Sequence, residues 1–265
     1  LAYEADSFER AAWLLIRFIA AESQEHSDSS GTSYFNGLFQ LYLSGTHASI
    51  HQRLNFINNL LKNSDKIHHE CGLKALHQML EAGHFSSCNA FEFGGRSRNY
   101  GWQPSSRDEE QDWYKNILKF CINMITDNSV FTEDICSIIA YNLRLLWLNA
   151  EIYDDIEHAV NVIISRRYWP QGWIAVCKTL LDGAETMPQD ILERLRSIEI
   201  KLKPVGLLHT ARTYALLPPW GAFDVADREE DDEQGLKSYE KADRKAKELG
   251  RLVATQPDIL DALLP

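Results

Sequence analysis

The sequence predicts an all-α fold, built either as degenerate helical repeats (a HEAT- or armadillo-like α-solenoid) or as an irregular helical bundle. Apolar residues recur three and four positions apart in successive stretches, which places them on one side of each helix. Alternating apolar and polar runs bounded by turns are scarce, so we expect essentially no sheet. Short links join the stretches, and consecutive amphipathic helices with short links form antiparallel pairs that can stack into repeats.

The first helices are marked by apolar stripes and by residues that can cap a helix. Thr46 is predicted to cap the helix that starts near Ile50, because its hydroxyl can accept a hydrogen bond from a free backbone N–H. Ser106 and Glu109 have the spacing of a capping box, in which each side chain satisfies a backbone N–H. Polar turns are expected at 63–65 and 127–129. The stripes fall at residues 50–61, 67–80, 113–124 and 135–146.

The later helices are separated by proline and glycine. Pro170 and Pro188 suit the first turn of a helix, where the missing N–H leaves no bond unmade. Gly183 suits a helix end, where a left-handed conformation is often needed. The corresponding stripes fall at residues 156–163, 173–180 and 191–202, and a charged helix is expected at 236–254.

The expected domain organisation follows from these breaks. We expect a helical-repeat domain over residues 1–217 with an inserted loop at 84–105. An acidic linker over 218–235 follows, because its run of acids favours a solvated segment. Residues 236–265 are expected to be a C-terminal helical segment that starts a further module. The chain begins at Leu1 rather than Met and ends within an apolar pattern, so we expect it to be part of a longer polypeptide.

Composition limits the surroundings of the protein. The 265 residues carry 27 Lys and Arg against 38 Asp and Glu, a net charge of −11, which argues against a broad nucleic-acid surface. The 5 cysteines form no C-x-x-C pair and mostly fall among apolar residues, which favours a reducing cytoplasm. The apolar stretch 11–21 is shorter than the roughly 20 residues that a membrane span needs, so no membrane segment is expected.

The most unusual segment is the glycine-, arginine- and aromatic-rich stretch 91–104. Loops longer than about 12–15 residues are uncommon in compact domains and are often functional. Its arginines offer planar forks for carboxylate or phosphate, and its aromatics are expected to fold back onto the helices. The loop is either a recognition loop or an ordered plug that covers a gap between helices. The candidate binding residues are Arg96, Arg98, Asn99, Tyr100 and Trp102.

A second candidate surface lies at 166–173. Aromatics interleaved with arginine can stack on bases or grip a peptide, which makes Arg166, Arg167 and Trp169 candidate binding residues. The other interpretation is a turn between repeats with Trp169 and Trp173 packed inside. Neighbouring acids and the overall negative charge favour this second interpretation.

No strong catalytic motif is present. His68 and Glu70 form the H-x-E of zinc deaminases, but the P-C-x-x-C half is missing. His47 and His51 lack a third ligand. Asp190 with 199–201 imitates a metal-nuclease pattern on what is expected to be a helix. We therefore expect no catalytic residue, metal or cofactor. A metal-dependent nuclease or hydrolase and a nucleic-acid-binding solenoid are kept as alternatives.

Three segments resemble a known protein class. Residues 41–46 (LYLSGT), 72–76 (GLKAL) and 93–104 (FGGRSRNYGWQP) resemble a helical segment of large bacterial multidomain NTPases of the STAND type, a class that includes antiphage-defence sensors. The resemblance covers roughly residues 39–147, and the segment lies downstream of the nucleotide-binding core. The phosphate-loop motif is absent from this chain. The resemblance implies a sensor or scaffold part, with any NTPase activity outside this chain.

The sequence thus predicts a non-catalytic, cytoplasmic, protein-binding helical region. Its partner is expected to be another protein or other domains of the parent polypeptide. No membrane contact is expected, and nucleic acid is disfavoured by charge.

Overall fold

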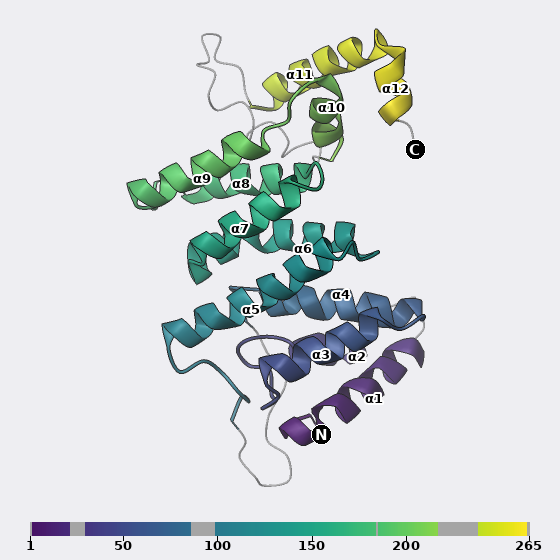
Figure 1. Cartoon of the computed structure of the whole chain (residues 1–265), viewed down its shortest axis with the longest axis vertical. Coiled ribbons are helices and arrows are strands. Elements are labelled where there is room, and N and C mark those ends of the chain that lie inside the picture. The colour runs from purple at the N-terminus through teal and green to yellow at the C-terminus, as the bar shows by residue number, and fades with distance from the viewer. Residues whose placement is uncertain (1, 22–29, 86–98, 184, 217–237, 264–265) are drawn as a thin grey trace. The chain divides into compact units, whose positions relative to one another are not determined.

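A computed structural model describes residues 2–21, 30–85, 99–183, 185–216 and 238–263 (Figure 1). Within these ranges the chain is helical between turns, and the single β-type pairing is an isolated parallel bridge between Thr46 and Gly101. The predicted all-α fold class is confirmed.

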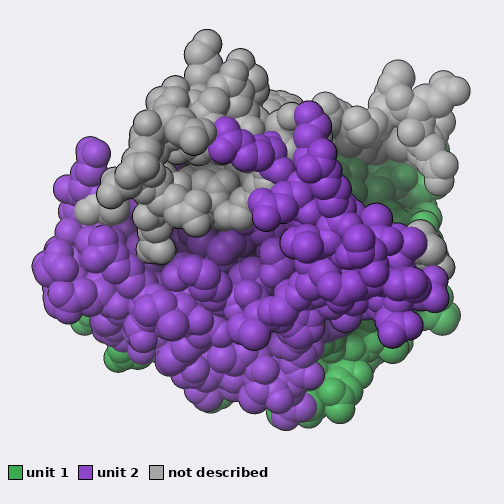
Figure 2. All heavy atoms as spheres, turned by 90° about the horizontal axis from the view of Figure 1, so that it is seen from above, with its two compact units in different colours: residues 1–156 green, residues 157–265 purple. Residues whose placement is uncertain are grey.

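The chain divides into two compact units, residues 1–156 and 157–265, which are described separately (Figure 2). Helix α7 (Tyr153–Ile164) contains the boundary between the units. The first unit holds η1 (Ala5–Ser7), α1 (Phe8–Ala21), α2 (Ser30–Gly37), α3 (Ile50–Leu61), α4 (Lys66–Leu80), α5 (Arg107–Thr126), α6 (Thr132–Leu145) and the π-helical η2 (Leu146–Ala150). The second holds α8 (Pro170–Gly183), α9 (Gln189–Leu202), α10 (Leu207–Ala215), α11 (Ser238–Ala254) and α12 (Pro257–Leu263).

Helices of the first unit pack as neighbouring pairs. Helix α1 packs on α2, α3 on α4, and α5 on α6, while α4 also touches α6 and α3 touches α5 (Figure 1). Contact between adjacent pairs is the packing pattern of helical repeats. Helix α4 lies at the centre of this unit, because it contacts α1, α2, α3, α5 and α6.

An aromatic cluster forms the core between the first two pairs. Phe8 of α1 lies 5.8 Å from both Phe39 and Phe56, measured between ring centroids, and Phe35 lies 5.0 Å from Phe39. All four rings are buried. Edge-to-face and tilted aromatic pairs add to the stabilisation that area burial provides.

The predicted cap at Thr46 is wrong, since Ser49 caps α3. The Ser49 hydroxyl accepts a hydrogen bond from the Gln52 N–H (3.3 Å), and the Gln52 side chain accepts one from the Ser49 N–H (2.9 Å). Thr46 is buried and pairs with Gly101 instead. At α5, Ser106 accepts from the Glu109 N–H as predicted (3.2 Å), but the Glu109 carboxylate accepts from Ser105 (2.8 Å) rather than from Ser106.

Helices of the second unit surround α8 and α10. Helix α8 packs on α9 and α10, and α10 also contacts α11 and α12. Arg194 of α9 donates a hydrogen bond to Glu157 of α7 at 2.7 Å. Helices α11 and α12 therefore belong to the same compact unit as α8, α9 and α10. Residues 217–237, which contain the whole of the predicted acidic linker, lie outside the described residues, so the predicted boundary at 217 stays a prediction.

The cysteines that the structure describes are buried, and its helices can be compared with the length and polarity that a membrane span requires. Cys71, Cys121, Cys136 and Cys177 are buried free thiols, and burial raises the pKa of Cys71 to about 11. Cys88 lies outside the described residues. Every helix within the described ranges is too short or too polar to cross a lipid bilayer.

Candidate functional site

The end of the long loop, residues 99–102, is held by backbone pairing and is called the anchored loop below. The Gly45 N–H donates to the Tyr100 carbonyl (2.9 Å), and the Trp102 N–H donates to the Thr46 carbonyl (2.8 Å). Gly101 has a φ of 86°, and a Cβ atom there would lie 2.4 Å from the Thr46 nitrogen. Only glycine therefore fits this close approach of two backbones.

Asn99 ties the anchored loop to two other segments. Its side-chain oxygen accepts hydrogen bonds from the Tyr3 hydroxyl (3.0 Å) and the Gly101 N–H (3.1 Å), and it lies 3.1 Å from His47 Nε2. The Tyr3 and His47 rings meet edge to face with centroids 4.8 Å apart, and the His47 N–H donates to the Tyr3 carbonyl (2.8 Å). Asn99, a predicted binding residue, therefore uses its oxygen to fix the loop.

Trp102 attaches the other end of the anchored loop to α5. Its ring stacks on Trp113 with centroids 5.4 Å apart and an angle of 20° between the planes. Trp113 is buried, and its indole N–H donates to the Met79 carbonyl at the end of α4 (2.9 Å). Half-buried Trp102 thus extends an aromatic stack that reaches into the core.

Arg53 organises the segment that receives the anchored loop. It is fully buried on α3 and donates hydrogen bonds to the carbonyls of Ala48 (3.1 Å) and Gln40 (2.8 Å) and to the Ser44 hydroxyl (3.2 Å). Its guanidinium also lies 5.0 Å from the Trp113 ring centroid. Burial lowers the pKa of Arg53 to about 9, so the side chain stays charged at neutral pH. Sequence reasoning missed this residue, although its place three positions after Ile50, on the apolar side of α3, was a signal.

Tyr100 is the exposed aromatic residue of the anchored loop. Its side chain is 54% exposed, while its own carbonyl and the Trp102 N–H are hydrogen-bonded to Gly45 and Thr46, before α3. A tyrosine on a fixed backbone offers a large amphipathic contact at a small loss of conformational entropy. Arg96 and Arg98 lie outside the described residues, so their part in this surface stays a prediction.

The second predicted surface belongs to the second unit, whereas the anchored loop belongs to the first. Arg166 is exposed and Arg167 is half-buried where α7 ends, and both backbone N–H groups donate to the Ile163 carbonyl (3.0 Å). Trp169 is only 2% exposed and covers Gly172, where a Cβ would lie 2.3 Å from the indole ring. This geometry agrees with the second interpretation of 166–173, a turn with Trp169 and Trp173 packed inside.

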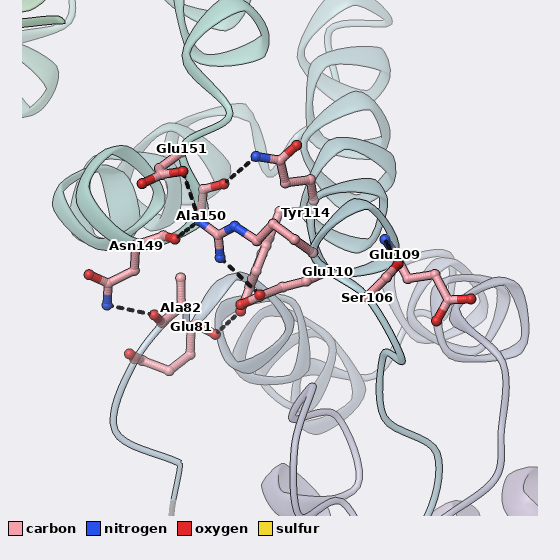
Figure 3. Close-up of polar contacts among 11 residues, drawn as sticks. Glu81, Ala82, Ser106, Glu109, Glu110, Tyr114, Asn149, Ala150 and Glu151 are labelled. Carbon is pink, nitrogen blue, oxygen red and sulfur yellow. Dashed lines mark hydrogen bonds and ion pairs between the residues drawn. The ribbon is translucent and has the colours of Figure 1, made fainter.

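A polar junction at the N-terminal end of α5 was not expected from the sequence (Figure 3). Arg107 pairs with Glu110 (2.8 Å) and Glu151 (3.3 Å), and it donates to the Asn149 carbonyl at the end of η2. Partial burial lowers the pKa of Arg107, but hydrogen bonds and charges from both glutamates outweigh this and raise it. Glu151 has a φ of 57°, so Arg107 also holds a residue in the left-handed conformation.

Other contacts in this junction satisfy backbone carbonyls where helices end. Gln111 donates to the Ala150 carbonyl (3.2 Å), Asn149 donates to the Ala82 carbonyl (2.8 Å), and the Tyr114 hydroxyl donates to the Glu81 carbonyl (3.0 Å) (Figure 3). The last carbonyls of a helix have no partner within the helix, so such side chains complete its end. The junction therefore serves to join α4, α5 and η2.

The residues of the weak catalytic motifs have structural contacts. His68 lies against Trp13, with ring centroids 5.2 Å apart. Glu199, from the nuclease-like pattern, lies on α9 and accepts a hydrogen bond from the Trp173 indole (2.7 Å). In the part of the chain that the structure describes, no group of three or more His, Cys, Asp or Glu side chains could hold a metal ion.

Comparison of the chain with protein-family models, curated proteins and solved structures finds no match. The resemblance to STAND-type NTPases therefore depends on the motif residues of the sequence alone.

Proposed function

We propose that this chain is a non-catalytic helical platform that binds a protein surface through the anchored loop. The partner is a separate protein or another domain of the parent polypeptide. Tyr100 is the central contact, because it combines 54% exposure with a carbonyl that accepts a hydrogen bond from the Gly45 N–H, next to the Asn99 side chain that is bonded to Tyr3.

The surroundings of Tyr100 support a protein partner. Tyrosine, tryptophan and arginine dominate the energetics of most protein–protein interfaces. Tyr3 and His47 lie beside Asn99 at the same surface and add aromatic contact area. The net charge of −11 makes a polyanion a poor partner, since phosphate binding needs a basic surface.

The motif resemblance supports a setting within a larger bacterial protein. We assign the chain to the sensor or scaffold part of a STAND-type NTPase that acts in phage defence, with nucleotide hydrolysis outside this chain. A cytoplasmic location is supported by the buried free thiols of the described residues, which a reducing compartment maintains.

Site-specific photo-crosslinking tests the proposal in cells that make the full-length parent protein. A photoreactive phenylalanine replaces Tyr100 in one version and Tyr141 in the control. Tyr141 is a matched control because it is also an exposed tyrosine (73%) but lies on α6, away from the anchored loop in sequence. We expect one defined cross-linked peptide from position 100 and none from position 141. Equal labelling at both positions, or none at either, contradicts the proposal.

Substitution of the surface gives a second test. Tyr100→Ala, and separately the double substitution Arg96→Ala with Arg98→Ala, are expected to abolish binding to the cross-linked partner without moving the thermal unfolding midpoint. Full binding by Tyr100→Ala would exclude the anchored loop as the interface.

A further inference from the structure

Asn142 joins α6 to α4 through a hydrogen bond to His77. Asn142 is fully buried on α6, and its Nδ2 atom lies 3.1 Å from His77 Nδ1 and 2.9 Å from the Ile138 carbonyl oxygen. An amide nitrogen only donates and a carbonyl oxygen only accepts, so the Ile138 carbonyl fixes the orientation of the amide. The second N–H of Asn142 then points to His77 Nδ1, which must accept. This geometry requires a neutral His77 with its proton on Nε2.

The other end of the same amide is unpaired. Asn142 Oδ1 is buried and has no hydrogen-bond partner among the described residues. A buried acceptor without a donor is unusual and costs stability. The pair thus contains a vacant acceptor beside a ring nitrogen that holds no proton.

We propose that His77 and Asn142 form a proton-sensitive latch between α4 and α6, which is closed while His77 is neutral and opens when His77 is protonated. Protonation places an N–H on Nδ1 opposite the N–H of Asn142, so the hydrogen bond is lost. The unpaired Oδ1 can accept a hydrogen bond from the new Nδ1–H only if the side-chain amide of Asn142 rotates by about 180°. That rotation breaks its hydrogen bond to the Ile138 carbonyl. The first outcome removes the hydrogen bond between α6 and α4. The second keeps a hydrogen bond between them, but it places Oδ1 against the Ile138 carbonyl oxygen, so it also costs stability.

Burial sets the direction of the effect with pH. His77 is half-buried, and this lowers its pKa below the ordinary value of 6.5. Tyr141 of α6 faces the imidazole edge to face, with centroids 4.7 Å apart. Lys74 of α4 and Glu81, which follows the last residue of α4, lie about one helical turn from His77 in sequence. Burial is the cause of the shift, with no charged side chain of the described residues contributing. Between the folded and unfolded pKa values the unfolded chain binds more protons, so the latch stabilises the protein above pH 6.5 and is lost as the pH falls.

Nuclear magnetic resonance of the intact chain tests the latch directly. At pH 7.5 the ring nitrogen shifts of His77 should show a proton on Nε2 and none on Nδ1. As the pH falls, the side-chain amide signals of Asn142 should change with the same midpoint as the His77 ring. A protonated Nδ1 at pH 7.5, or Asn142 signals that ignore the titration, overturns the proposal.

Urea unfolding at pH 7.5 and pH 5.5 adds a test by substitution. His77→Asn keeps an acceptor near the Nδ1 position that cannot be protonated, and exposed His51 on α3 supplies the control His51→Asn. The midpoint should fall less on acidification in His77→Asn than in the wild type, while His51→Asn falls as the wild type does. An equal fall in all three proteins contradicts the latch. The resonance titration of the wild type decides the question even if His77→Asn fails to fold.

Discussion

The anchored loop and the turn at 166–173 have similar compositions and opposite structures. The stretch 91–104, which contains the anchored loop, and the turn each combine arginine, large aromatics and glycine, and each was a candidate surface on the sequence. Tyr100 in the loop is 54% exposed, whereas Trp169 in the turn is 2% exposed. Residue content alone therefore does not separate a surface that can receive a partner from one that is part of the core.

The two glycines explain the difference. Gly172 leaves space for the Trp169 ring, since a Cβ would lie 2.3 Å from it. Gly101 leaves space for the backbone of Thr46, whose nitrogen would lie 2.4 Å from a Cβ, and this backbone pairing leaves Tyr100 outside. Gly172 thus lets the Trp169 ring pack against the helix backbone, where it is buried. Gly101 lets the loop backbone pair with Thr46, next to exposed Tyr100.

The largest expected effect on stability comes from removing the buried aromatic, Trp169, and removal of the exposed Tyr100 is its counterpart. Trp169→Ala should lower the free energy of unfolding by about 3–5 kcal/mol, because it empties a buried site of a large side chain. Tyr100→Ala should change it by less than about 0.5 kcal/mol, as is usual for exposed residues. Urea unfolding followed by circular dichroism measures both. Similar losses in the two variants would remove the contrast on which the comparison depends.

Adding a methyl group at Gly101 sharpens the comparison. Gly101→Ala combines a positive φ with a backbone clash and should cost about 1–3 kcal/mol. Hydrogen exchange should quicken at the Gly45 and Trp102 amides, which pair across this contact. Gly37→Ala is the control, since nothing lies within 4 Å of a Cβ there. Unchanged exchange at Gly45 and Trp102 in Gly101→Ala would show that the loop is not held at this point.

A smaller loss of stability than at Trp169 or Gly101 is expected at Asn99. Asn99→Ala removes the acceptor for Tyr3 and Gly101 and should cost about 1 kcal/mol, the net value of ordinary exposed hydrogen bonds. Asn99→Asp keeps an acceptor oxygen and should lose less than Asn99→Ala. Partner binding measured on both variants then separates the fixing role of Asn99 from direct contact, because only a direct contact would be lost in Asn99→Asp.

The sequence predicted correctly those features that depend on residues close together in the chain. The stripes at 50–61 and 67–80 match α3 and α4 closely, and Pro170 begins α8 as the first-turn preference predicts. It failed where two residues could play the same local role. Thr46 and Ser49 can both cap a helix, and only the pairing of Thr46 with Gly101 assigns the cap to Ser49.

The candidate site was predicted in part. The loop was recognised from its glycines, aromatics and arginines. Tyr3 and His47, which contact Asn99, and Arg53, which is bonded to the segment that receives the loop, lie far from it in sequence. Hydrogen bonds over such separations leave no periodic pattern. Contacts of the polar junction at α5 that span about 40 residues, such as Gln111 to Ala150, were missed for the same reason.

The sequence by itself determined the helices, most of their ends and the absence of a strand pattern, because helix periodicity and capping depend on residues three or four positions apart. Only the tertiary structure decided which aromatics are exposed and which residues brace the loop. Burial depends on what another segment brings to the same place, and residues 45–46 and 100–102, which pair in the structure, are separated in sequence by α3 and α4.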